Sequence, residues 1–234
     1  MPSTKKLLQA AAGSAGGDKL YVEDVFSAYV FTGTGANMII TNGIDLLEGG
    51  LVWAKNRNVT NAHYLFDTSS NGALLLQSNV DSAAIAVSPP YMVAQSTGYK
   101  TAGADSGWNG VDQSMVSWTF REAEKFFDIV TYTGNSVNGR AVAHNLGSVP
   151  AMIIIKNLDV DNKWYVWIKG FANDDFLYLN DDFEKNRGGA YAYLTANPTS
   201  TTVTVGSDGS VNQNTKDYVM YLFGDEAAFG DDGD

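Results

Sequence analysis

The pattern of apolar and polar residues along the chain is that of short β-strands separated by turns. Met152 to Ile155 is a continuous apolar run, which is typical of a strand buried on both faces. Thr201 to Val205 alternates threonine and valine, which is the pattern of a strand with one buried face. A turn-rich link, Asn157 to Asn162, separates the first run from the apolar segment Trp164 to Ile168, so the sequence predicts a β-hairpin there.

Other segments have the same strand-and-turn pattern, and few segments have the pattern of a helix. The further predicted strands are Leu51 to Lys55, Tyr64 to Asp67, Leu74 to Gln77, Met115 to Phe120, Val130 to Gly134 and Tyr218 to Phe223. Only Lys5 to Ala12 and Phe120 to Phe127 have the pattern of a short helix. Many short strands at such spacings predict an all-β protein of the β-sandwich type, with a jelly-roll-like topology as one solution.

The sequence also repeats itself at an offset of 101 residues. The matched segments are Phe31 to Gly33 with Tyr132 to Gly134, Tyr64 to Phe66 with Tyr165 to Trp167, and Trp118 to Phe120 with Tyr221 to Phe223, where the offset has drifted to 103. We therefore predict two tandem β-sandwich copies from an internal duplication, at residues 25–125 and 126–224. An N-terminal arm (residues 1–24) precedes them, and an acidic tail or a junction to further sequence (residues 225–234) follows.

Composition excludes several classes of function. The chain of 234 residues has no cysteine, which excludes disulfides, thiolate zinc sites and a cysteine nucleophile. Its net charge of −11 would repel phosphate, so no nucleic-acid partner is expected. No stretch approaches the roughly 18 apolar residues of a membrane span, so we expect no membrane insertion.

The sequence contains no catalytic motif. His63 and His144 lie at loops or strand starts, away from any metal-spaced partner or nucleophile. A glycosidase needs only two carboxylates at a set distance, and the candidates for that role are Glu122, Glu124, Asp174, Asp175, Asp181 and Asp182. Because these acids fall in turn-like segments or in the link between the copies, we expect no enzymatic activity and no organic cofactor.

One loop has the residues of a calcium site. Asp159 and Asp161 alternate along the link after Asn157, so their oxygens could be presented to one cation. The loop lacks the glycine at position 6 and the glutamate at position 12 of a helix-loop-helix site. Aspartates are also ordinary turn formers, which is the alternative interpretation.

Several segments taken together resemble a known family. In the second copy they are Tyr132 to Gly134, His144 to Pro150 and Met152 to Lys156. This order resembles the repeated β domain of virion structural proteins from tailed bacteriophages, many of them marine or cyanobacterial, which are commonly called tail fibres or putative tail proteins.

The resemblance implies a location in the virion and a role in host attachment, without catalysis. It implies a homo-oligomer, most often a trimer, that contacts other virion proteins such as a tail adaptor, a nozzle or the capsid. A host surface glycan or receptor would be the external partner. The alternatives are a capsid decoration (cement) protein and, from a different class, a glycan-degrading tailspike.

The N-terminal arm has the composition of an attachment segment. It is rich in small residues, and its larger side chains are Lys5, Lys6, Leu7 and Leu8. Such a segment has too little apolar surface to offset its own ordering entropy. We expect it to order on another virion protein, with the leucines in an apolar groove and the lysines against acidic groups. The alternative is a disordered terminus without a partner.

Overall fold

The computed structural model describes residues 20–102, 107–187 and 193–227, and nearly all of the regular structure in them is β. The strands of the first copy are β1 (Phe26–Thr32), β2 (Met38–Thr41), β3 (Gly50–Asn56), β4 (Tyr64–Asp67), β5 (Leu74–Gln77), β6 (Ile85–Ala86), β7 (Met92–Gln95), β8 (Gly98–Thr101) and β9 (Ser114–Arg121). Those of the second copy are β10 (Phe127–Thr133), β11 (Arg140–Ala143), β12 (Met152–Asn157), β13 (Tyr165–Ile168), β14 (Asp175–Tyr178), β15 (Asn186–Arg187), β16 (Thr202–Val205) and β17 (Asp217–Phe223).

Helices are few and short in the described residues. They are α2 (Val22–Val25), the 3-10 helix η1 (Leu46–Glu48) and α3 (Gly209–Asn212). No helix in this part of the chain is long and apolar enough to cross a membrane. The predicted all-β sandwich fold class is confirmed.

The two copies have the same sheet topology. Each has a large six-stranded sheet, with the order β1-β9-β3-β4-β5-β6 in the first copy and β10-β17-β12-β13-β14-β15 in the second. A small sheet covers one face of each, β2-β8-β7 in the first copy and β11-β16 in the second. The register repeats as well, since Phe26 pairs with Phe120 and Phe127 pairs with Phe223. The strand order and register thus repeat at the offsets that the sequence predicts.

The topology is jelly-roll-like in its outer strands. The first and last strands of each copy pair in the large sheet, and the second strand pairs with the next-to-last in the small sheet. This nested pairing is the jelly-roll feature. The middle strands β3 to β6 and β12 to β15 instead form antiparallel meanders, which include the predicted hairpin between β12 and β13.

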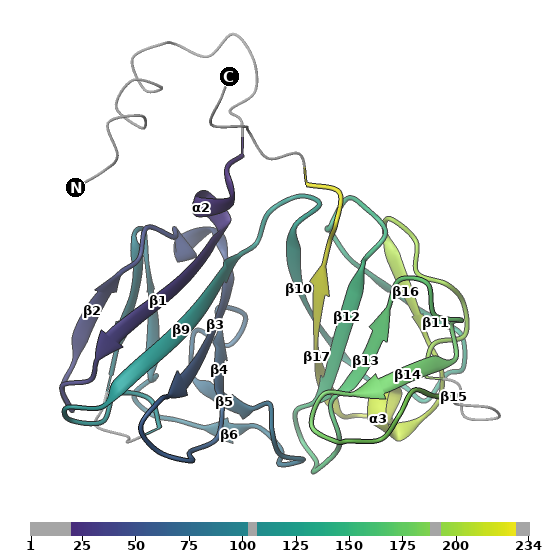
Figure 1. Cartoon of the computed structure of the whole chain (residues 1–234). Coiled ribbons are helices and arrows are strands. Elements are labelled where there is room, and N and C mark those ends of the chain that lie inside the picture. Colours follow the sequence, from purple (N-terminus) through teal and green to yellow (C-terminus); the bar gives the residue numbers. More distant parts are fainter. Residues whose placement is uncertain (1–19, 103–106, 188–192, 228–234) are drawn as a thin grey trace, which may run out of the picture.

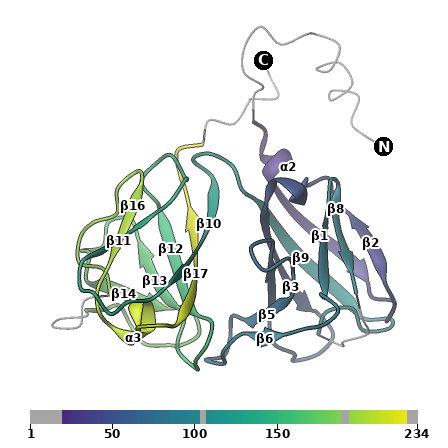
Figure 2. The same ribbon diagram turned by 180° about the vertical axis from the view of Figure 1, so that it is seen from behind.

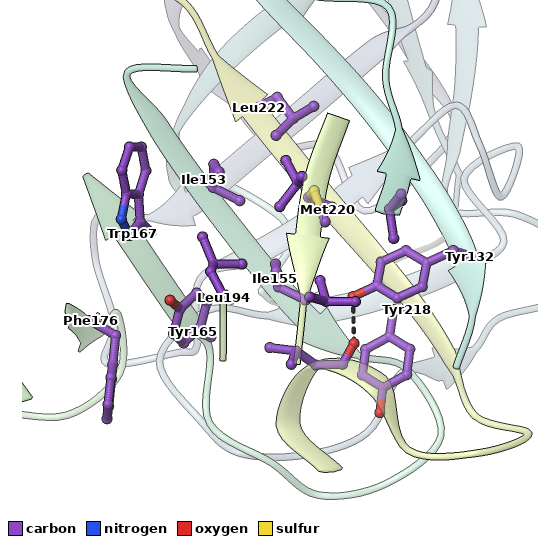
Figure 3. Close-up of a cluster of buried hydrophobic side chains, with 14 of the residues drawn as sticks. Tyr132, Ile153, Ile155, Tyr165, Trp167, Phe176, Leu194, Tyr218, Met220 and Leu222 are labelled. Carbon is purple, nitrogen blue, oxygen red and sulfur yellow. Dashed lines mark hydrogen bonds between the residues drawn. The ribbon is translucent and has the colours of Figure 1, made fainter. Parts of the chain in front are cut away.

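Each sandwich has its own apolar core between its two sheets. In the second copy, Ile155 and Met220 of the large sheet (Figure 3) belong to one buried cluster with Val203 of the small sheet. Tyr132 stacks on Tyr218 there, and its hydroxyl donates a 2.6 Å hydrogen bond to the carbonyl of Val211. The ring of Tyr132 therefore contributes apolar area without leaving a buried hydroxyl unpaired.

A third apolar cluster lies between the two copies. It joins Leu51 and Leu65 of the first large sheet to Ile154 and Val219 of the second. The large sheets therefore face each other across this cluster, and the small sheets lie on the outer sides, as both views show (Figures 1 and 2). We call this contact the inter-sandwich interface.

The interface explains the continuous apolar run of β12. Alternate side chains of a strand point to opposite faces of its sheet. Ile153 and Ile155 enter the core of the second sandwich, whereas Ile154 enters the inter-sandwich cluster. The prediction that Met152 to Ile155 form a strand buried on both faces is confirmed, and β12 and its equivalent β3, over the predicted strand Leu51 to Lys55, are interior strands of their sheets.

One local prediction is wrong, and another concerns residues outside the described part of the chain. Phe120 to Phe127 is not helical: β9 runs through Arg121, and a tight turn closed by an Ala123–Phe127 bridge leads into β10. Both ends of this segment extend the ladders of large sheets, and strand pairing overrides its helical pattern. The predicted helix at Lys5 to Ala12 lies outside the described residues.

Candidate functional site

The two aspartates of the predicted calcium loop each accept a backbone hydrogen bond. Asp159 Oδ2 accepts from the N–H of Asp217 at 2.8 Å, and Asp161 Oδ1 accepts from the N–H of Ala83 at 3.0 Å. Among the described residues, no group of three or more acidic, histidine or cysteine side chains could hold a metal ion. Asp161 therefore has a structural role, because its hydrogen bond joins the two copies. The calcium site stays a prediction.

The other candidate residues lie apart from one another. The four arm residues Lys5, Lys6, Leu7 and Leu8 fall outside the described part of the chain. His63 Nδ1 accepts a 3.3 Å hydrogen bond from Trp53 Nε1, and His144 accepts from the N–H of Leu146 at 3.3 Å. Burial lowers the pKa of both histidines, so both are mainly neutral at neutral pH.

Two of the candidate acids lie in ion pairs near the edge of the second large sheet. Asp181 pairs with Lys163, and Asp175 pairs with Lys185 at 2.8 Å. The Lys163 ammonium lies between two aromatic rings, 5.0 Å from the centre of Tyr178 and 4.9 Å from that of Phe183. These carboxylates serve as partners of lysines, which is a structural arrangement.

The inter-sandwich interface is polar at one end. Trp164, which is fully buried, donates from Nε1 to the carbonyl of Gln77 at 3.1 Å. The carbonyl of Asp81 accepts from the Lys156 ammonium at 3.0 Å and from the N–H of Asn162 at 2.8 Å. In these contacts the first copy supplies carbonyl oxygens from the end of β5 and the segment after it, and the second copy supplies the donors, from β12 and from the loop between β12 and β13.

Lys156 is fully buried at this contact. Burial lowers the pKa of its ammonium to about 8, against the opposing effect of the negative charges of Asp81 and Asp161. Its equivalent in the first copy, Lys55, is partly exposed and donates to the carbonyls of Asn56 and Val59 within its own loop. The two copies therefore use the same lysine position differently, and only the second uses it to bind its neighbour.

The opposite end of the interface contains three carboxylates, Asp67, Glu122 and Asp128, which we call the junction carboxylates. Asp67 Oδ2 accepts a 2.6 Å hydrogen bond from the fully buried hydroxyl of Tyr221, which joins β4 to β17. Glu122 Oε1 accepts from the N–H of Ile129 at 2.9 Å. Burial, together with the negative charges of Asp128 and Asp67, raises the pKa of Glu122 to about 7.

A groove of about 550 Å³ lies at the end of the first sandwich. Its lining residues are Leu46, Leu47, Glu48, Gly49, Thr68, Asn71, Met92, Val93 and Ala94. One wall is β7, which pairs on one side only, with β8. In the second copy the strand equivalent to β7 is reduced to a single bridge between Leu194 and Val205. The groove is thus walled by a strand, β7, that has no full equivalent among the described residues of the second copy.

Most of these contacts have no signal in the sequence. Asp67 and Tyr221 lie in segments with the pattern of ordinary strands, Asp128 lies between the predicted elements, and only the fold brings the three residues to one junction. One signal of the interface is present in the sequence, the apolar run Met152 to Ile155. A strand that is apolar on both faces must be covered on the face that points away from its own sandwich as well.

These observations define a class: a tandem β-sandwich protein whose two copies share one strand order and bury their large sheets against each other. The chain belongs to the family described as "Domain of unknown function (DUF7483)", whose model matches residues 22–233. That match covers both copies, so the pair of sandwiches is the unit that the family describes. Comparisons with curated proteins and with solved structures return no match.

Proposed function

We propose that this chain is a structural protein of a bacteriophage virion, a tail fibre or its virion-proximal part, that serves host attachment. The sequence resemblance to repeated β domains of tail proteins supports the assignment. The inter-sandwich interface is the structural observation that supports it best. A fibre must transmit force without its domains separating, and an apolar interface with polar contacts at both ends resists that separation.

Apolar packing and directional hydrogen bonds make the inter-sandwich interface stiff. Its centre is apolar and closely packed, with Leu51 and Ile154 each at 3% exposure or less. At its two ends lie directional hydrogen bonds, from Tyr221 to Asp67 and from Trp164 to Gln77. Sliding one sheet over the other would break these bonds and leave buried polar groups unpaired, at a cost of roughly 1–3 kcal/mol for each group.

The remaining parts of the proposal follow from the same role. The arm (residues 1–24) attaches to another virion protein, and the chain assembles as a homotrimer. Exposed apolar side chains of the first copy offer contact area for subunits: Val30 is 56% exposed and Ile39 is 62% exposed. Apolar residues of this kind are typical of the centre of subunit interfaces.

Immunogold labelling of purified particles tests the proposal. An antiserum raised against the purified chain should place gold on the tail, and digestion of the same particles should yield its peptides by mass spectrometry. Gold distributed over the capsid shell would replace the tail-fibre assignment with a capsid decoration protein. Particles that contain no peptide of this chain would contradict a virion role altogether.

A second measurement separates a fibre from a glycan-degrading tailspike. We expect the purified protein to release no reducing ends from host envelope polysaccharide. Release that a single substitution, such as Asp175→Asn, abolishes would show that the chain is an enzyme.

A further inference from the structure

The junction carboxylates lie where the chain passes from one sandwich to the other. Glu122 follows the last strand of the first copy, and Asp128 lies in the first strand of the second. Asp67 ends β4 of the first copy and accepts the Tyr221 hydroxyl of the second. Asp67 and Asp128 are 5% and 7% exposed, so solvent screens their charges poorly.

Each of these carboxyl groups has a defined position. Asp128 Oδ2 accepts a 2.7 Å hydrogen bond from the N–H of Asn145. Glu122 accepts from Ile129 and also hydrogen-bonds with the Asp128 side chain. It lies directly over Gly49, because a Cβ atom on that glycine would be 1.9 Å from Glu122 Oε2.

The second copy has a different arrangement at the equivalent site. The register places Asp225 where the first copy has Glu122, and Lys169 where it has Thr68. Lys169 forms an ion pair with Asp225 at 3.1 Å. One carboxylate is thus neutralised by a lysine, whereas its equivalent at the junction faces two further carboxylates. Of these two equivalent sites, the one at the junction brings carboxylates together, and the other pairs its carboxylate with a lysine.

We propose that the junction carboxylates are a pH-sensitive lock between the two sandwiches. With Glu122 protonated, its carboxyl group donates to Asp128 and the junction is closed. When Glu122 loses that proton, its negative charge is added beside those of Asp128 and Asp67, and their repulsion loosens the contact between the large sheets. The proposal is independent of the virion assignment, because it concerns only the two copies within one chain.

The sign of the effect follows from the pKa of Glu122. Its folded value of about 7 lies above the ordinary value of 4.5, so the folded protein holds this proton where the unfolded chain has released it. Stability from this group is complete below pH 4.5 and is lost as pH rises to about 7. His63 and His144, with lowered pKa values, act in the opposite direction below pH 6.5.

Other charged groups near the junction must be considered in the same range. Arg121, Glu124 and Lys125 flank Glu122 in the turn, and the Asp128 charge acts on His144. Lys156, at the far end of the interface, titrates at about 8. The difference between the parent and a Glu122 variant isolates the effect of Glu122 from all of these groups.

A distance measurement tests the lock directly. The chain has no cysteine, so Val59→Cys and Val137→Cys, at positions 43% and 55% exposed, place one spin label on each sandwich. Between about pH 6 and about pH 8, the label-to-label distance should lengthen and its distribution should broaden, with a midpoint near 7. In the Glu122→Gln background, which carries no charge at this position, both should stay at their acidic values.

Two further variants make the result decisive. Glu124→Gln changes an exposed glutamate of the same turn and should leave the pH response unchanged. Asp128→Asn removes one repelling charge and should move the midpoint to lower pH. A distance that is constant across this range in the parent, or a response that survives in Glu122→Gln, would overturn the proposal.

Discussion

Replacing Ile154 by aspartate should remove a large part of the stability of the whole molecule. Ile154 is 3% exposed and lies in the apolar cluster between the two large sheets. Its apolar burial contributes roughly 1.5–3 kcal/mol. A carboxyl group in its place has no partner; protonated, it costs about 1–3 kcal/mol more, and an ionised carboxylate costs more again. The expected loss is therefore about 4 kcal/mol, a substantial fraction of the 5–15 kcal/mol typical of folded proteins.

Thermal unfolding followed by circular dichroism measures this loss. For a chain of this size, about 4 kcal/mol corresponds to a fall in Tm of roughly 10 °C. Val137→Asp is the matched control, because Val137 is 55% exposed in the same copy. Its substitution should change stability by no more than about 0.5 kcal/mol. An Ile154→Asp protein with a Tm within about one degree of the parent would refute the buried placement of this strand face.

Three other substitutions test separate contacts. Tyr221→Phe removes the hydrogen bond from the Tyr221 hydroxyl of β17 to the Asp67 carboxylate and should lower the free energy of unfolding in urea by about 1.5–3 kcal/mol. The pKa of Lys156 in the folded protein is about 8, below the ordinary value of 10.5, so the free energy of unfolding of the parent should rise as pH rises between these two values. Lys156→Met should lack this rise. Gly134→Ala places a Cβ atom 2.1 Å from a backbone carbonyl and should cost about 1–3 kcal/mol by thermal unfolding, whereas Gly209→Ala, whose nearest neighbour is at 3.6 Å, should cost less.

The strand pattern and the repeat were readable from the sequence for physical reasons. A run such as Met152 to Ile155 is apolar at every position because both faces of β12 are buried, one in its own sandwich and one in the interface. The offset of 101 residues persists through β3, β4 and β5 because equal hairpin loops keep the register of the meander. A strand of two residues such as β6 has too few positions to establish a period.

The candidate site was not readable in the same way. Tyr221 and Asp67 are 154 positions apart, and neither residue type nor local pattern indicates that they meet. The sequence places Glu122 in a link between copies, where a solvated carboxylate is the ordinary expectation. The raised pKa of Glu122 depends on burial at the junction and on the charges of Asp128 and Asp67, which come together only because the two large sheets face each other. Contacts between copies are a property of the tertiary arrangement, so local patterning does not encode them.

Differential scanning calorimetry of the intact chain tests most directly whether the two sandwiches form one structural unit. If the interface couples them as its buried centre and polar ends imply, the chain unfolds in one transition, with equal calorimetric and van 't Hoff enthalpies. Ile154→Asp should shift that single transition or split it in two. Two separate transitions in the parent protein, each with the enthalpy of a single sandwich, would contradict the account.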